Sequence, residues 1–375
     1  MIVPMTDIQI QYQKHKSEFD SAIQRVLDSG YFILGKEVAD LESAIAGYLD
    51  VKYAVACASG TDALQVAMMA LNIKSGDEVI TTPFTFVATA ETVVLLGATP
   101  VYVDIDERTY NIDASKIEAA ITPKTKAIIP VHLYGQAAEM DTIMEIARKH
   151  KIAVIEDNAQ GVGATYKERK AGGIGDIGTI SFFPSKNLGA FGDAGMMVTN
   201  NETWSQKMRM ICNHGSRVRY QHEILGVNSR LDTIQAAILN VKLKYLDEWN
   251  EGRRKIVGKY NDLLRGTQVI TPYVEPYNRH IYHQYTLRVQ NRDGLGEFLK
   301  TKGIPWAVHY PIPLHLQPAF AHLKYGKGAC PVAEKIAAEV ISLPIHPELT
   351  DEQLVYVTDA IKEFSGMRRA PDNYN

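Results

Sequence analysis

Two stretches of the sequence decide the expected fold: Glu156-Asp157-Asn158-Ala159-Gln160 and Ser181-Phe182-Phe183-Pro184-Ser185-Lys186. Each follows a short apolar run, at residues 152–155 and 178–180. Short β-branched runs that are bounded by glycine and polar residues predict buried strands. Asp157 is therefore expected at the end of one strand, and Lys186 just beyond the end of another.

Asp157 and Lys186 are the two residue types that pyridoxal phosphate chemistry requires. A lysine amine forms a Schiff base, and a carboxylate keeps the pyridine nitrogen protonated so that the ring accepts electrons. For two isolated residues, however, a surface ion pair is the better explanation. The pair therefore has to be weighed together with the rest of the chain.

The first half of the chain alternates between apolar runs and segments with helical spacing. Strands are expected at 53–57, 78–81, 100–104 and 127–131, and helices at 64–71, 86–96, 114–121 and 139–150. This alternation predicts right-handed crossovers and a largely parallel sheet that is covered on both faces. Ligands of such sheets bind beyond the carboxyl ends of the strands, where Asp157 and the turns 59–62 and 83–86 are expected.

The turn Ser59-Gly60-Thr61-Asp62 joins an expected strand to an expected helix. Free N–H groups and the positive end of the helix dipole would make this turn a phosphate site. The same residues are also an ordinary helix N-cap. The turn alone leaves both interpretations open.

The alternation loosens after Lys186. We expect a glycine-rich hairpin at 188–195, a strand at 196–199, a helix at 204–212 and a long helix from 233 to about 264. Strands at 282–289 and 305–309 and helices at 294–302, 332–341 and 351–364 predict a smaller α+β domain. The expected division is a large domain with its N-terminal segment (1–248), a small domain (249–366) and an unstructured tail (367–375).

A helix followed by an apolar turn is expected over residues 7–35. Two glycines, Gly30 and Gly35, enclose four large apolar residues that include Phe32. Such a turn either packs on the core as a hydrophobic staple or forms an aromatic wall for a flat ligand. Taken alone, it favours the staple.

Composition excludes several classes of protein. The chain has 375 residues, a net charge of −3, 46% hydrophobic and 22% charged residues, which is typical of a soluble globular protein with two domains. No basic excess points to nucleic acid, no apolar run approaches the roughly 18 residues of a membrane span, and no signal peptide is recognisable. Three cysteines without a C-x-x-C pair favour a reduced, cytoplasmic setting.

Three further patterns need an interpretation. The G-x-G-x-x-G pattern at 173–178 precedes an expected strand instead of opening a helix, so it does not indicate nicotinamide binding. The loop at 309–315 has two histidines, but its prolines prevent a shared helical face, which favours a substrate-facing loop over a metal site. Asn228 and Arg230 are either an N-cap and a solvated charge or ligands for an anion.

Together these motifs resemble those of the DegT/DnrJ nucleotide-sugar aminotransferases, pyridoxal phosphate enzymes with the aspartate aminotransferase (type I) fold. The resemblance spans about residues 5–365 and rests on the motifs at 59–64, 156–160, 181–186, 226–232 and 309–311. Within the family, the chain looks most similar to the UDP-2-acetamido-2-deoxy-3-oxo-D-glucuronate aminotransferases. The stretches 102–106, 307–314 and 342–347 carry that narrower similarity.

The resemblance implies a role for each matching residue. Lys186 would be the Schiff-base lysine and proton shuttle, Asp157 would pair with the pyridine nitrogen, and Gln160 would bind the phenolic oxygen. Phe86 would stack on the ring. The phosphate would be held by Gly60, Thr61, Asp62 and Ser181, with Asn228 from a neighbouring subunit. The sugar nucleotide would contact Gly30, Phe32, Ser185, His309 and Tyr310, with Arg230 also from the neighbour.

The reaction that this resemblance implies is a transamination in a homodimer with shared sites. Glutamate would convert the cofactor to pyridoxamine phosphate, and a keto-sugar nucleotide would receive the amine for surface polysaccharide such as O-antigen. An aminotransferase for another 3- or 4-keto-6-deoxy sugar nucleotide is the alternative. A sugar dehydratase is less favoured because such relatives carry histidine where this chain has Lys186, and a non-enzymatic sensor because no DNA-binding module is recognisable.

Overall fold

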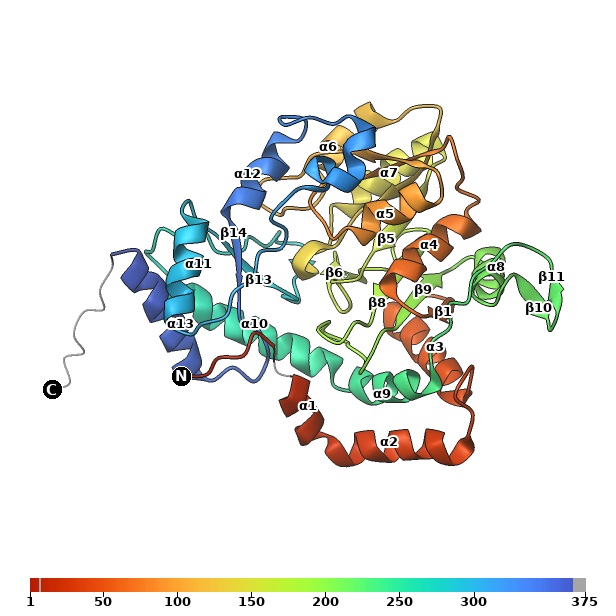
Figure 1. Cartoon of the computed structure of the whole chain (residues 1–375), viewed down its shortest axis with the longest axis horizontal. Helices are drawn as coiled ribbons and strands as arrows, with labels where there is room; N and C mark the ends of the chain where they lie inside the picture. The colour runs from red at the N-terminus through yellow and green to blue at the C-terminus, as the bar shows by residue number, and fades with distance from the viewer. Residues whose placement is uncertain (7, 367–375) are drawn as a thin grey trace.

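A seven-stranded sheet forms the centre of the computed structural model, which describes residues 1–6 and 8–366 (Figure 1). Its strands are β1 (Tyr53–Cys57), β2 (Glu78–Thr81), β3 (Thr99–Tyr102), β4 (Thr125–Ile129), β5 (Ala153–Asp157), β8 (Ile177–Ser181) and β9 (Gly195–Thr199). Their order is β1-β9-β8-β5-β4-β2-β3. Only β9 runs antiparallel to its neighbours, so the expected, mainly parallel sheet is confirmed.

Helices cover both faces of this sheet. The helices are α3 (Lys36–Leu49), α4 (Gly60–Ala70), α5 (Ala88–Leu95), α7 (Met140–His150), α8 (Glu202–Cys212) and α9 (Thr233–Leu243). Helices α4, α5 and α8 share one buried cluster with Ile155 of β5, whereas α7 shares another with the adjacent Val154. Successive strand residues point to opposite faces, so both faces of β5 are buried and its polar end is fixed in place.

A smaller sheet carries the C-terminal helices. Strands β13 (Tyr285–Arg288) and β14 (Val340–Leu343) pair antiparallel. They share a buried cluster with α10 (Leu246–Leu263), α11 (Arg292–Thr301) and α13 (Asp351–Phe364). The expected boundary between 248 and 249 falls inside α10 and stays a prediction. The expected tail at 367–375 lies outside the described residues.

The remaining elements are short or peripheral. They are α1 (Ile8–Lys14), α2 (Lys16–Ser29), α6 (Ala114–Ile117), α12 (Pro331–Glu339), β6 (Thr165–Tyr166), β7 (Arg169–Lys170), β10 (Ser216–Val218), β11 (Gln221–His222), β12 (Asn278–Arg279) and four 3-10 segments, Glu118–Ala120, Leu133–Gly135, Leu314–Leu316 and Pro318–Leu323. Among the described helices, none combines the length and apolar character needed to cross a membrane.

Several expected elements differ from the structure. The long helix expected from residue 233 is two helices, because α9 ends at Leu243 and α10 begins at Leu246. No glycine or proline marks this break, and apolar residues continue across it. The strand expected at 305–309 is reduced to an isolated bridge between Ala307 and Ser342. The helix expected to reach residue 341 ends at Glu339, because the next residues pair in β14.

The apolar turn after α2 does not pack on the core as a staple, so that expectation was wrong. Tyr31 is 72% exposed and Phe32 47%. The backbone explains this orientation: Thr233 N–H donates to the carbonyl of Phe32, and Ile33 forms a bridge with Asp232. The turn is thus tied to the start of α9 through its main chain, and its side chains face outward.

Candidate active site

A cavity of about 440 Å³ lies at the carboxyl ends of the central strands. Asp157 ends β5, Ser181 ends β8, and the turn after β1 opens α4. The predicted residues that line this cavity are Gly60, Thr61, Phe86, Asp157, Gln160, Ser181, Ser185, Lys186, His309 and Tyr310. The parallel part of the sheet therefore brings most of the predicted site together at one edge, as expected for this class of fold.

Asp157 is held by two hydrogen bonds in the floor of the cavity. Its side chain accepts a bond from Thr89 Oγ1 at 2.8 Å and one from the Ala159 N–H at 3.2 Å. Burial raises the pKa of Asp157, although both hydrogen bonds and nearby Lys186 act in the opposite direction. A cationic ring nitrogen placed against this carboxylate would keep it ionised.

Lys186 faces the same cavity and has an unusually acidic amine. Burial lowers its pKa to about 8, and the carboxylate of Asp157 opposes this shift. With this pKa, about a tenth of the amine is neutral at pH 7 and able to accept a proton, far more than for an ordinary lysine. This combination of a nucleophilic amine and a nearby buried acid is suited to carbonyl and imine chemistry.

The N-terminus of α4 forms one end of the cavity. Ser59 caps the helix by accepting a hydrogen bond from the Asp62 N–H at 3.1 Å, so the capping interpretation is correct. The free N–H groups and the dipole of α4 also point to the cavity, where they favour an anion. Asp62 itself does not line the cavity, and its carboxylate accepts a bond from Ser229 Oγ at 2.6 Å.

Gly60 allows the start of α4 to lie close to Ser181 at the end of β8. A Cβ atom at residue 60 would lie 2.6 Å from Ser181 Cβ and 3.1 Å from Ser181 Oγ. We therefore expect Gly60→Ala to displace Ser181 and to weaken cofactor binding by at least about tenfold, since overpacking typically costs 1–3 kcal/mol. Equilibrium titration with pyridoxal phosphate measures this change.

Gly47→Ala is the matched control, because a Cβ at this helical glycine would meet no atom within 4 Å. Its cofactor affinity should equal that of the wild type. Equal affinity in Gly60→Ala would show that the turn does not hold the phosphate.

Gln160 links the cavity wall to an aromatic pair. Its Oε1 accepts a hydrogen bond from the Tyr134 N–H at 2.7 Å, and its Nε2 donates to Tyr310 Oη at 3.0 Å. Burial raises the pKa of Tyr310, so its hydroxyl stays protonated. The ring centroids of Tyr310 and Phe86 are 6.2 Å apart. Phe86 is 53% exposed and available for stacking on a flat ligand.

Besides Asp62, four predicted residues do not line the cavity of their own chain: Gly30, Phe32, Asn228 and Arg230. Asn228 is exposed. Arg230 lines a separate cavity of about 440 Å³ together with Arg209 and Glu42. Its Nε is buried and has no hydrogen-bond partner in the described chain. A single chain therefore leaves this part of the predicted site incomplete.

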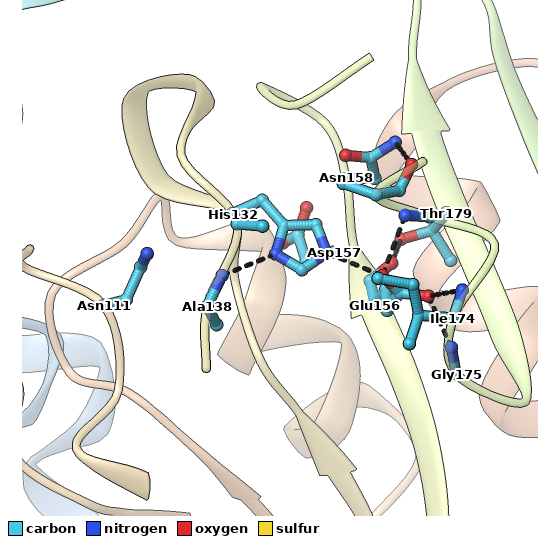
Figure 2. Close-up of polar contacts among 12 residues, drawn as sticks. Asn111, His132, Ala138, Glu156, Asp157, Asn158, Ile174, Gly175 and Thr179 are labelled. Atoms are coloured by element: carbon cyan, nitrogen blue, oxygen red, sulfur yellow. Dashed lines mark hydrogen bonds and ion pairs between the residues drawn. The ribbon is translucent and has the colours of Figure 1, made fainter. Parts of the chain in front are cut away.

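Two fully buried residues adjacent to Asp157 form a hydrogen-bonded pair (Figure 2). His132 Nε2 lies 2.8 Å from Glu156 Oε2, and the backbone N–H of His132 donates to the carbonyl of Asp157. The N–H of Ala138 donates to His132 Nδ1, so the imidazole carries its proton on Nε2 and donates it to Glu156. This neutral ring connects the segment after β4 to the functional end of β5.

Glu156 also binds the backbone of the loop at the G-x-G-x-x-G pattern. Its carboxylate accepts hydrogen bonds from the N–H groups of Gly172, Ile174 and Gly175 at 2.6–2.8 Å. Burial would raise the pKa of Glu156, but the bond from His132 and the backbone N–H groups outweigh burial and lower it. The glycines thus shape a loop around a buried carboxylate, which agrees with the rejection of a nicotinamide site.

Sequence reasoning missed several groups at the site. Thr89, His132 and His283 were not predicted, although Thr89 bonds Asp157 and His283 lines the cavity. Thr89 belongs to an expected helix after the 83–86 turn, and its place near the helix start was the available signal. His132 and His283 gave no signal, since each depends on contacts that are distant in sequence.

The residues present fit pyridoxal phosphate. The cavity offers a buried acid for a ring nitrogen, a desolvated lysine for an aldehyde, an exposed aromatic ring and a helix N-terminus for a phosphate. These groups come from four separate segments that meet only in the folded chain.

The model of the DegT/DnrJ/EryC1/StrS aminotransferase family matches residues 13–362. The chain belongs to this family. The family assignment and the expected fold are thereby confirmed, and so are pyridoxal phosphate as cofactor and pyridoxamine phosphate as its intermediate form. The chain is a pyridoxal phosphate-dependent sugar-nucleotide aminotransferase.

Similar proteins carry several different names. A "pleiotropic regulatory protein" of Geobacillus stearothermophilus is 51% identical and aligns over 97% of this chain and 99% of its own. The UDP-2-acetamido-2-deoxy-3-oxo-D-glucuronate aminotransferase of Pseudomonas aeruginosa is 49% identical over 96% and 99%. The crystal structure of S. venezuelae DesV in complex with a ketimine intermediate has a TM-score of 0.95 and 42% identity over 97% of this chain and 98% of its own. Names of other relatives specify dTDP-linked and GDP-linked amino sugars.

Proposed function

We propose that the enzyme transfers the amine of glutamate to the 3-oxo group of UDP-2-acetamido-2-deoxy-3-oxo-D-glucuronate, a step in the synthesis of surface polysaccharide. The 49% identity to the Pseudomonas aeruginosa enzyme of that name supports this choice of substrate. The observation that carries the reaction type is the placement of Lys186 and Asp157 in one cavity.

Each protein group has a distinct task in this proposal. Bound pyridoxal phosphate supplies an electron sink that stores the amine between the two substrates. Lys186 removes a proton from the amino donor and returns one to the sugar carbon, which its low pKa permits. Asp157 holds the ring nitrogen, and the α4 N-terminus with Ser181 holds the phosphate.

A second subunit completes the site in this proposal. Asn228 and Arg230 lie outside the cavity of their own chain, and Arg230 has an unpartnered, buried Nε. In a homodimer, Asn228 would reach the partner's phosphate end and Arg230 an anionic group of the sugar nucleotide. The exposed Phe32 would lie near the same substrate.

The second candidate is amination of another keto-sugar nucleotide, which the names of the dTDP- and GDP-linked relatives favour. A carboxylated 3-oxo sugar needs a cation, and arginine can bind a carboxylate with two hydrogen bonds. Arg230 is the residue that we assign to this task. A neutral 4-keto-6-deoxy sugar would not need it.

Rates with a panel of keto-sugar nucleotides separate the two candidates. We expect the carboxylated UDP-3-oxo sugar to exceed its uncharged analogue and a dTDP-4-keto-6-deoxy sugar by at least about tenfold in kcat/KM, the effect of one charge-assisted contact. Arg230→Gln should remove this preference. Arg265→Gln, a change at an exposed arginine, should keep it. Preference for the 4-keto sugar in the wild type would contradict the proposed substrate.

A further inference from the structure

His283 is a buried histidine that no step above uses. It lies between β12 and β13, it is 6% exposed, and it lines the cavity that holds Lys186. Its Nδ1 lies 3.3 Å from Oδ1 of Asn187, the residue that follows Lys186 in the chain. His283 is thus connected to the lysine both through the cavity and through the adjacent backbone.

The neighbours of Asn187 determine which nitrogen of His283 carries the proton. Asn187 Nδ2 lies 3.2 Å from the backbone carbonyl of Ile281 and 2.7 Å from Asn250 Oδ1. A backbone carbonyl only accepts hydrogen bonds, so the amide nitrogen of Asn187 must face it. The amide oxygen then faces His283, and Nδ1 of the ring must be the donor.

The second nitrogen of His283 is consequently an acceptor. A neutral imidazole with its proton on Nδ1 has a bare lone pair on Nε2. No group in the described part of the chain is hydrogen-bonded to Nε2, and this atom is not among the fully buried, unpartnered ones. Because His283 lines the cavity, Nε2 is the ring nitrogen that remains available there.

The surroundings of His283 keep the ring neutral. Burial lowers its pKa well below the ordinary value, and the positive charges of Lys186 and Arg253 lower it further, as does His309. His309, the other histidine of the cavity, has its Nδ1 2.9 Å from Ser342 Oγ, and burial lowers its pKa to about 4. Both histidines of the cavity are therefore neutral, and neither places a second positive charge beside the Lys186 amine.

We propose that His283 is a positioning residue for Lys186. In the cofactor-free chain the ε-amino group forms no hydrogen bond with the described residues. With cofactor and substrate in the cavity, the amine that is released from the cofactor donates a hydrogen bond to His283 Nε2. The amine has one lone pair for the reacting proton, and its N–H groups can donate to an acceptor in the cavity wall. An acceptor at a fixed place restricts the rotation of the amine and directs its lone pair. The proposal rests on the proposed function because it assumes that Lys186 is the proton shuttle.

Two substitutions at His283 distinguish the role of Nδ1 from that of Nε2. His283→Asn can keep the bond to Asn187 but has no atom at the Nε2 position, whereas His283→Gln places an amide oxygen there. We expect His283→Asn to slow both half-reactions, with glutamate and with the sugar nucleotide, by about tenfold, the effect of one lost hydrogen bond. Binding of either substrate should change little, and His283→Gln should restore most of the rate.

Single-turnover absorbance measurements on the cofactor-loaded protein give these rates. His280→Asn is the control, because His280 is equally buried but accepts a hydrogen bond from the Tyr282 N–H and does not line the cavity. Its rates should equal those of the wild type. A loss confined to the sugar half-reaction would show that Nε2 contacts the sugar, which would overturn the proposal. Unchanged rates in His283→Asn would overturn it as well.

Nitrogen-15 NMR of the histidine rings tests the tautomer without any turnover. In the full-length, cofactor-loaded protein, His283 should carry its proton on Nδ1 and none on Nε2, and His283→Asn identifies the signal by its loss. A proton on Nε2 would refute the proposal.

The failure of the proposed substrate can be distinguished from the failure of the His283 proposal. The glutamate half-reaction needs no sugar nucleotide, so a wild-type protein that reacts with glutamate but aminates none of the sugars would refute the proposed substrate and leave the His283 comparison intact.

Discussion

Lys186→Ala should lower the turnover of the enzyme by at least about 10³-fold, within the range that general acid–base catalysis contributes. No other lysine lines the cavity in the described part of the chain. The variant should also lose the absorbance of lysine-bound cofactor. Its unfolding midpoint should stay close to that of the wild type, because the Lys186 amine has no hydrogen bond or ion pair among the described residues. Steady-state rates, absorbance spectra and thermal unfolding measure the three effects.

Lys242→Met controls for the loss of a buried lysine as such. Lys242 is 1% exposed, and burial lowers its pKa to about 8, as it does for Lys186. However, Lys242 lies over the ring of Phe191 and outside the cavity. Turnover of Lys242→Met should be close to that of the wild type. A Lys186→Ala protein that keeps transaminating would contradict the assignment of Lys186.

Glu156→Ala should destabilise the fold more than any other substitution proposed for this chain. It removes the acceptor of three backbone N–H groups and of His132 Nε2–H; the bonds from His132 and Gly172 are buried, and those from the other two N–H groups are part-buried. Each buried donor left without a partner costs about 1–3 kcal/mol, and two of the four donors are fully buried, so the loss should be at least about 2 kcal/mol. Urea unfolding of the cofactor-loaded protein measures the change.

Glu118→Ala is the matched control for Glu156→Ala. Glu118 also pairs with a histidine, His150, at 2.7 Å, but this pair lies at the surface, where water replaces the lost partner. Its unfolding midpoint should be nearly unchanged. Equal stability of the two variants would show that the Glu156 network does not hold the end of β5.

The depressed pKa of Glu156 sets the sign of its pH dependence. Because the folded pKa lies below the ordinary value of 4.5, the contribution to stability is fully present above about pH 4.5. It is lost as the pH falls through the folded pKa. The stability difference between the wild type and Glu156→Ala should therefore narrow in acid.

The local part of the site could be predicted from the sequence. Alternating strands and helices place Asp157 and Lys186 at strand ends, and that alternation depends on residues near one another in the chain. The antiparallel direction of β9 agrees with the glycine-rich hairpin expected at 188–195, because this connection from β8 contains no crossover helix. The direction of that strand is decided by the connection and not by the strand's own residues.

The long-range contacts of Thr89 and His283 at the site could not be predicted, for a physical reason. Thr89 reaches Asp157 across 68 residues, and His283 reaches Asn187 across 96. Such contacts follow from tertiary packing and leave no periodic pattern in the sequence. Asn228 and Arg230 depend on a second chain in our proposal, so neither the sequence nor one folded chain places them at a cofactor.

Transfer of a nitrogen isotope from glutamate to the sugar nucleotide is the direct test of the proposed reaction. The cofactor-loaded protein is incubated with glutamate labelled with nitrogen-15 and with the carboxylated UDP-3-oxo sugar, and the sugar nucleotide is analysed by mass spectrometry. We expect a product that carries the labelled amine at C3, and no labelled product with Lys186→Ala. A wild-type protein that leaves this sugar nucleotide unlabelled would contradict the proposed function.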